Sequence, residues 1–352
     1  MRFPRYWWLL LLAPVSWVSK LTIHNDLLTF FTAAGAVIPL AGLIGRSTDQ
    51  LAMHAGPRLG GLLNATFGNV TELIVAIFLV LDDKLDVVKA SLIGSIIGNL
   101  LLVLGLSMLL GGLRHEEQRF NAKAAGVHAT SLALAVAGLL MPALFVLLEH
   151  GRHGFVQREV VSVTIALVLI ALYVSALVFT LVTHQHLFRT PTEEERPAWS
   201  VRTSVGVLTV TTALVAVQSE LLVGALDQTV SDLGVSRFFV GLILIPIIGN
   251  AAEHGSAVFF ALKDKLDVTL EIAIGSSTQI ALFVAPVLVL ISLAVGHPMD
   301  FVFSPFEIAA VALSTFIMSL ISLDGMSNWL EGAQLLGAYA IMGVSFFFVE
   351  KL

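Results

Sequence analysis

Hydrophobic residues in this chain gather into long runs separated by short polar stretches. The runs have about the 20 apolar residues that a helix needs to cross a bilayer, and far exceed the roughly 9–11 residues of a membrane β-strand. We therefore predict an all-α polytopic membrane protein with about 11 transmembrane helices. The predicted segments lie near residues 6–23, 27–46, 59–81, 88–113, 124–148, 159–183, 203–226, 238–262, 268–295, 302–323 and 329–349.

The first segment allows two interpretations. Arg2 and Arg5 precede a run of tryptophan and leucine, which resembles a secretory signal peptide. The stretch that follows has no clean small-x-small cleavage site, and Trp7 and Trp8 suit an anchor at the membrane surface. We favour a retained N-terminal transmembrane helix over residues 1–24.

Two parts of the chain repeat one another. Gly-Asn-x-x-Glu occurs at residues 68–72 and 249–253, and Asp-Lys-Leu-Asp-Val follows each copy at the same distance. With a constant shift of 181 residues, 19 of 50 positions between residues 60 and 109 are identical in the second copy. Each half holds five predicted segments, an odd number, so the two repeats should cross the membrane in opposite senses. The predicted units are an N-terminal helix (1–24), a first repeat (25–183), a polar acidic linker (184–202) and a second repeat (203–352).

Composition supports a membrane protein and excludes several classes of site. The chain is 57% hydrophobic and 12% charged, against roughly 25% charged residues in a soluble domain. The net charge of −6 gives no reason to expect a nucleic-acid partner. The chain has no cysteine, so disulfides, thiolate metal sites and cysteine nucleophiles are excluded. No nucleotide-binding loop or His-Glu-x-x-His helix is present, so we expect neither an enzyme nor an ATP-driven pump, and no organic cofactor.

Each repeat places one acidic residue, Glu72 or Glu253, in the middle of a predicted spanning segment. A charged side chain at the centre of such a helix costs about 2.5–3.5 kcal/mol on the insertion scale. Each carboxyl group should therefore be either protonated or neutralised by a bound cation. These states exclude one another, which is the physical basis of cation–proton exchange, and two carboxylates match the charge of a divalent ion.

The residues around the acids indicate the type of cation. Asn69 and Asn250 each precede the glutamate by three positions, on the same face of a helix. Carboxylate and amide oxygens without sulfur favour Ca²⁺, with Mn²⁺ as an alternative, over zinc or copper. Gly68 and Gly249 permit close helix approach and local unwinding, which could free backbone carbonyl groups as further ligands.

These motifs resemble the calcium/cation–proton exchanger family of the calcium/cation antiporter superfamily. The resemblance spans nearly the whole chain and is most specific between residues 60 and 99. It implies ten core helices in two inverted repeats with one extra N-terminal helix. It also implies an antiporter in which Glu72 and Glu253 bind calcium or protons in turn.

The family's second pair of motifs corresponds to residues 94–99 and 275–279. The resemblance implies that four polar residues of these motifs line the ion pathway and face the two acids: Ser95, Asn99, Ser276 and Gln279. Ordinary packing of small residues is the alternative. The chain lacks the serine and proline of the sodium-driven relatives' Thr-Ser-x-Pro-Glu sequence, which favours protons over sodium as the counter-ion.

Three further polar residues are candidates for gating or proton coupling. His254 adjoins Glu253 but points roughly 100° away from it on a helix. Asp49 follows Thr48 as Glu220 follows Ser219, so the two acids could occupy matched gate positions. The alternatives are a packing histidine and acids near the membrane surface.

The linker carries Glu193, Glu194 and Glu195 between two prolines. In the resembled family an acidic segment at this place is associated with regulation by calcium, and a solvated run of charge is the alternative.

The distribution of basic residues predicts the orientation. With a cytoplasmic N-terminus, 12 of the 19 Lys and Arg residues lie on the cytoplasmic side. The length and sparse loops suggest a prokaryotic plasma membrane. We expect Ca²⁺, H⁺ and lipid as partners, with homo-oligomerisation left open. A sodium-coupled exchanger and a cation channel are the alternative functions.

Overall fold

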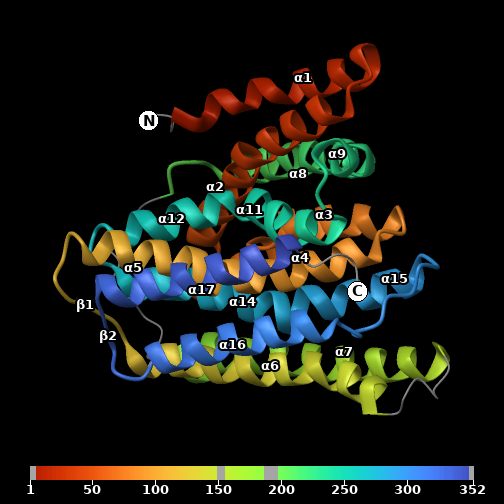
Figure 1. Ribbon diagram of the computed structural model, residues 1–352. Coiled ribbons are helices and arrows are strands. Elements are labelled where there is room, and N and C mark those ends of the chain that lie inside the picture. The colour runs from red at the N-terminus through yellow and green to blue at the C-terminus, as the bar shows by residue number, and fades with distance from the viewer. Residues whose placement is uncertain (1–4, 149–154, 186–196, 349–352) are drawn as a thin grey trace.

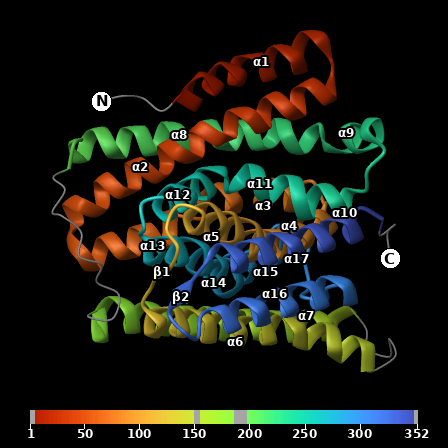
Figure 2. The same cartoon turned by 60° about the vertical axis from the view of Figure 1, so that its left-hand side comes forward.

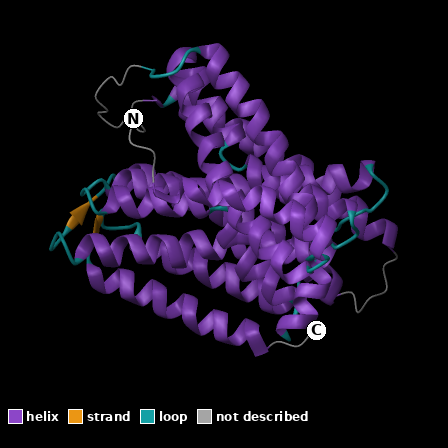
Figure 3. Cartoon of the chain, turned by 90° about the horizontal axis from the view of Figure 1, so that it is seen from above, coloured by secondary structure: helices purple, strands orange, loops and turns teal. Residues whose placement is uncertain are grey.

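The computed structural model describes residues 5–148, 155–185 and 197–348. Nearly all regular structure in this part of the chain is helical, and one short pair of strands lies at the edge of the molecule (Figures 1 and 3). The prediction of an all-α polytopic protein is confirmed in this coarse form.

The first half runs from the N-terminus to residue 183, and η denotes a 3₁₀ or π-helical turn. Its elements are η1 (Arg5–Leu11), α1 (Leu12–Val18), η2 (Ser19–Ile23), α2 (Asp26–Phe67), α3 (Val70–Leu81), α4 (Leu85–Ile97), η3 (Gly98–Val103), α5 (Leu104–Gly112), β1 (Gln118–Arg119), α6 (Ala122–Leu148), α7 (Phe155–Val178) and η4 (Phe179–Thr183).

The second half has more and shorter elements. They are α8 (Val201–Gly224), α9 (Leu226–Leu233), α10 (Arg237–Phe239), η6 (Val240–Leu244), α11 (Ile245–Gly249), α12 (Ala251–Ala261), α13 (Leu266–Leu270), η7 (Glu271–Gly275), α14 (Ser276–Gln279), η8 (Ile280–Val284), α15 (Ala285–Ala294), α16 (Pro305–Ile321), β2 (Met326–Ser327) and α17 (Trp329–Phe348).

Every predicted hydrophobic segment overlaps helix in the described residues, and the helix that contains the segment 27–46 continues to residue 67. Within the described residues, eight helices are long and apolar enough to cross a membrane, and a bent pair, Leu226–Leu233 with Arg237–Gly249, would make nine. The pair turns through 113°. The apolar helices Trp7–Ile23 and Pro305–Ile321 fall below the usual spanning length.

The helices form layers around a buried centre. The segment from η1 to α2 lies with α8 and α9 at the top of Figures 1 and 2, and α6 and α7 lie at the bottom. Between them lie α3 to α5 and α11 to α15, which contribute much of the large hydrophobic core. A separate small core of Leu40, Ile44, Leu208 and Val215 joins α2 to α8.

The repeated sequences adopt matching turns. Asp83 and Asp264, which correspond under the shift of 181, have positive φ angles of 56° and 58°. Gly56 has a φ of 79° and breaks α2 into two spans, a conformation that glycine adopts without strain. Strand β1 pairs antiparallel with β2, which ties a loop of the first half to the second half.

Candidate functional site

Each Gly-Asn-x-x-Glu motif interrupts a helix at its asparagine. Asn69 has φ and ψ of −98° and 16°, and Asn250 has nearly the same values, −102° and 6°. Helices α3 and α12 begin directly after them, so Glu72 and Glu253 lie in the first turn of their helices. The positive end of the helix dipole favours a carboxylate at this place.

Glu72 is held by residues from both halves. Its Oε1 accepts a hydrogen bond from the Asn250 Nδ2 atom at 2.5 Å and another from the Ser95 hydroxyl group. Asn250 Nδ2 also lies 3.3 Å from the Ser95 oxygen and 3.1 Å from the backbone oxygen of Pro246. The asparagine of the second motif therefore donates a hydrogen bond to the glutamate of the first motif.

The amide of the first motif crosses to the second half in the same way. Asn69 Nδ2 donates to Gln279 Oε1 at 2.6 Å, and Asn69 Oδ1 accepts from the Ser276 hydroxyl group at 2.9 Å. Asn99 Nδ2 donates to Ser276 at 3.2 Å, and Asn99 Oδ1 lies 3.2 Å from His254 Nε2. One chain of hydrogen bonds thus links all these side chains.

Two carboxylate oxygens in this cluster have no hydrogen-bond partner among the described residues. They are Oε2 of Glu72 and Oε2 of Glu253, and both are buried. An unsatisfied buried oxygen of this kind costs about 1–3 kcal/mol, and more if it is charged. A proton or a cation bound there would remove the cost.

The motif glycines bring the two acids together. A Cβ atom on Gly249 would lie 3.3 Å from Cγ of Glu72, and one on Gly68 would lie 3.8 Å from Oε1 of both Glu253 and Gln279. Each glutamate therefore packs on the glycine of the other motif.

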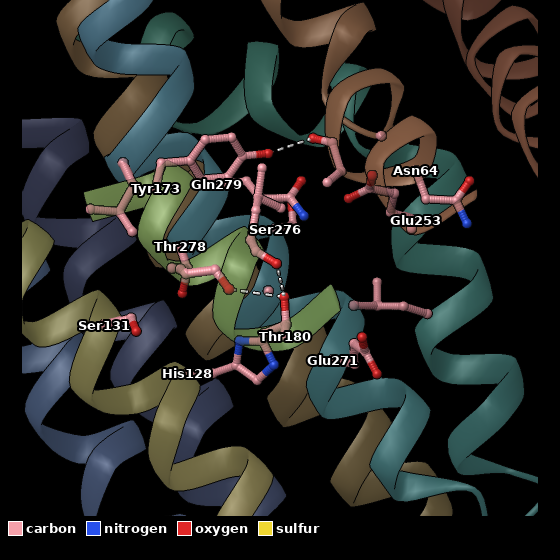
Figure 4. A pocket seen from close by; sticks show the side chains of 18 of the residues that line it. Asn64, His128, Ser131, Tyr173, Thr180, Glu253, Glu271, Ser276, Thr278 and Gln279 are labelled. Carbon is pink, nitrogen blue, oxygen red and sulfur yellow. Dashed lines mark hydrogen bonds between the residues drawn. The ribbon is translucent and has the colours of Figure 1, made fainter. Parts of the chain in front are cut away.

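A large cavity leads from one face of the protein to one of the acids. It has a volume of about 1460 Å³ and is lined by Glu253, Ser276 and Gln279 at its inner end (Figure 4). Towards the face it is lined by Asp49 on α2 and by the beginning of α6 and the end of α7. Glu72 instead borders a void of about 20 Å³, enough for one water molecule.

Ion pairs join the halves at the opposite face. Lys84 pairs with Asp82 and lies 3.5 Å from Asp227, and Asp227 lies 2.7 Å from Arg237. Half-buried Lys89 pairs with Asp300 nearby. The residues thus connect the loop after α3 to α9 and α10, and the protein is open on one face and closed on the other.

The other predicted site residues are placed as follows. Asp49 lines the cavity, whereas Glu220 has an exposed side chain outside its lining, so the two acids do not occupy matched surroundings. Glu193, Glu194 and Glu195 lie outside the described residues.

Sequence reasoning missed several cavity residues, including Asn64, His128, Tyr173 and Glu271. Glu271 could have been found, because it is an acid inside a predicted span.

No group of three or more His, Asp or Glu residues in the described part of the chain could hold a metal ion. A cation between Glu72 and Glu253 would need amide, hydroxyl, backbone or water oxygens to complete its shell. The asparagines, Ser95 and Ser276 supply such oxygens, and Ca²⁺ accepts this mixture.

Comparisons with known proteins identify the family to which this chain is related. The family model described as sodium/calcium exchanger protein matches residues 26–182 and 203–348. The Ca(2+)/H(+) antiporter of Aphanothece halophytica is 44% identical over 97% of this chain and 95% of its own length. The Ca(2+)/H(+) antiporter ChaA of Bacillus subtilis is 42% identical over 95% of this chain and 96% of its own.

Solved structures share the fold. Native YfkE has a TM-score of 0.86 and 38% identity, and the match covers 98% of this chain and 100% of that one. The H+/Ca2+ exchanger CAX has a TM-score of 0.75 at 14% identity, over 98% of this chain and 92% of that one, a likeness of fold alone. The chain belongs to the sodium/calcium exchanger protein family, as the resemblance to its cation–proton exchangers indicated.

Proposed function

We propose that this protein is a secondary antiporter that exchanges Ca²⁺ for H⁺ across a membrane. Glu72 and Glu253 hold either the cation or protons. The observation that carries the proposal is the pair of buried carboxylates, each with one unpartnered oxygen among the described residues. Relatives named Ca(2+)/H(+) antiporters, similar over nearly their full length, support the same exchange.

The finer topology belongs to the same proposal. Eleven spans would comprise the N-terminal helix and two inverted repeats of five, with the short and bent helices completing the count. Opposite orientation of the repeats explains why Asn250 serves Glu72 and Asn69 contacts the residues beside Glu253.

Alternating access follows from the difference between the halves. Here Glu253 borders the open cavity while Glu72 is closed in by Ser95 and Asn250. An exchange of these two arrangements would close this cavity and open one to the other face. The cavity opens where α2, α6 and α7 approach the linker, the cytoplasmic face of a prokaryotic plasma membrane in the predicted orientation.

The test is Ca²⁺ uptake into proteoliposomes under an imposed pH gradient, with a sodium gradient as the second arm. We expect uptake to follow the pH gradient alone. Lower pH on the Ca²⁺ side should raise the KM for Ca²⁺ without changing the maximal rate, because protons and the cation compete for the same oxygens. Uptake that follows sodium and ignores pH would contradict the proposal.

The variants Glu72→Gln and Glu253→Gln should each slow exchange by about 10-fold to 150-fold, because charge-assisted ligand bonds of roughly 1.5–3 kcal/mol are lost. Glu116→Gln is the matched control, since Glu116 is exposed in a loop and does not line the cavity. Thermal unfolding of each variant checks that the fold is retained.

A further inference from the structure

A third acid stands in the cavity between Glu253 and the open face. Glu271 begins η7, about one and a half turns before Ser276, and its side chain is exposed to the cavity (Figure 4). Gly275 and Thr278 follow at helical spacing and line the same cavity. Glu271 thus lies on the wall along which a cation would travel to the inner end.

The carboxylate of Glu271 has no partner among the described residues. It forms no ion pair or hydrogen bond with any residue of 5–148, 155–185 or 197–348. A carboxylate in an apolar span has no structural benefit unless it meets a partner. Because Glu271 lines the cavity, a cation that enters from the solution can act as its partner.

The other charged side chains of the lining are differently placed. The Arg46 guanidinium group stacks on the rings of Trp7 and Trp199 at centroid distances of 5.7 and 5.9 Å. Asp49 lies one helical turn beyond Arg46 on α2, so a positive charge lies near its carboxylate. Lys123 lies at the beginning of α6 and makes no ion pair with Glu271.

The repeats differ at this position. Under the shift of 181 residues Glu271 corresponds to Ala90, which is fully buried against the other half. A Cβ atom on Gly241 would lie 3.0 Å from the Ala90 methyl group. The first repeat therefore brings no acid to this place, and any role of Glu271 belongs to one face of the membrane.

We propose that Glu271 captures the divalent cation as it enters from the cavity face and passes it on to Glu253. The inference rests on the proposed exchange of Ca²⁺ for H⁺. One carboxylate with water binds Ca²⁺ weakly, which suits a residue that must release the ion inwards. Its negative charge raises the local concentration of cations at the inner end of a low-dielectric cavity.

The experiment measures Ca²⁺ transport in membrane vesicles of both orientations. In Glu271→Gln the KM for Ca²⁺ offered at the cavity face should rise about threefold to tenfold, and the KM at the opposite face should stay unchanged. The increase should shrink at high ionic strength. Glu271→Asp keeps the charge and should restore most of the wild-type KM.

Glu116→Gln is again the matched control, because it removes the same charge from the same face without touching the cavity. An unchanged KM at the cavity face in Glu271→Gln, with normal exchange by the wild type, would overturn the inference. Equal loss from both faces would also overturn it, because Glu271 would then belong to the shared central site. Wild-type protein that fails to exchange Ca²⁺ for H⁺ would instead refute the proposed function.

Discussion

At the scale of single residues, the two motif asparagines do not act as their spacing suggests. Three positions separate each asparagine from its glutamate, which predicts a shared helix face. The helix breaks at the asparagine instead, and Asn250 turns to Glu72 of the other repeat. The spacing identified the right residues, but it could not show this pairing, because the pairing depends on how the two halves meet.

His254 is the residue whose role the hydrogen bonds make testable. Because Asn99 Nδ2 donates to Ser276, Asn99 Oδ1 is left to accept from His254 Nε2. We expect His254→Ala to slow exchange by about tenfold at most, because the variant loses one hydrogen bond, which contributes roughly 0.5–1.5 kcal/mol.

The variant His254→Gln separates positioning from proton transfer. A glutamine amide can still donate to Asn99, so a positioning role predicts partial recovery with an unchanged pH profile of the exchange rate. Loss of one limb of that profile in His254→Gln would show that the imidazole itself titrates during transport.

At the scale of elements, the closed side depends on a close crossing of α4 and η6. A Cβ atom on Gly94 would lie 2.0 Å from the backbone oxygen of Leu242, so the two backbones touch. Gly241 meets α4 almost as closely, since a Cβ atom there would lie 3.1 Å from the backbone oxygen of Val87. In lipid there is no hydrophobic driving force between helices. Close van der Waals packing at small residues therefore holds such crossings together.

Gly94→Ala should therefore destabilise the protein by about 1–3 kcal/mol or more, because backbone must move to admit the methyl group. Thermal unfolding in detergent measures the loss. The control is Gly98→Ala one turn later, where a Cβ atom would meet no atom of the described residues within 4 Å. Equal unfolding temperatures for the two variants would contradict the crossing described here.

At the scale of the whole molecule, hydrophobic patterning located the helices, and the repeated motifs located the two acids. The pattern could not locate the 113° turn before α10, because hydropathy records the length of a run and not its direction. Nor could it show that one repeat is open and the other closed. The related local sequences of the two halves are compatible with either arrangement, and tertiary contacts decide between them.

Gly275→Ala tests whether the two repeats exchange arrangements. Gly275 corresponds to Gly94 and lines the cavity, where its Cβ atom would meet nothing within 4 Å of the described residues. After an exchange it would pack as Gly94 does now, against the backbone of Gly61, the counterpart of Leu242. The added methyl group is therefore harmless in this state and obstructive in the opposite one.

We expect Gly275→Ala to unfold at the wild-type temperature and to bind Ca²⁺ in detergent, yet to exchange it at least about tenfold more slowly, since a methyl group forced into a tight crossing costs roughly 1–3 kcal/mol. Gly98→Ala again serves as the control, because its counterpart Gln279 already carries a side chain. Exchange at the wild-type rate in Gly275→Ala would mean that this cavity closes by some movement other than a swap of the two repeats.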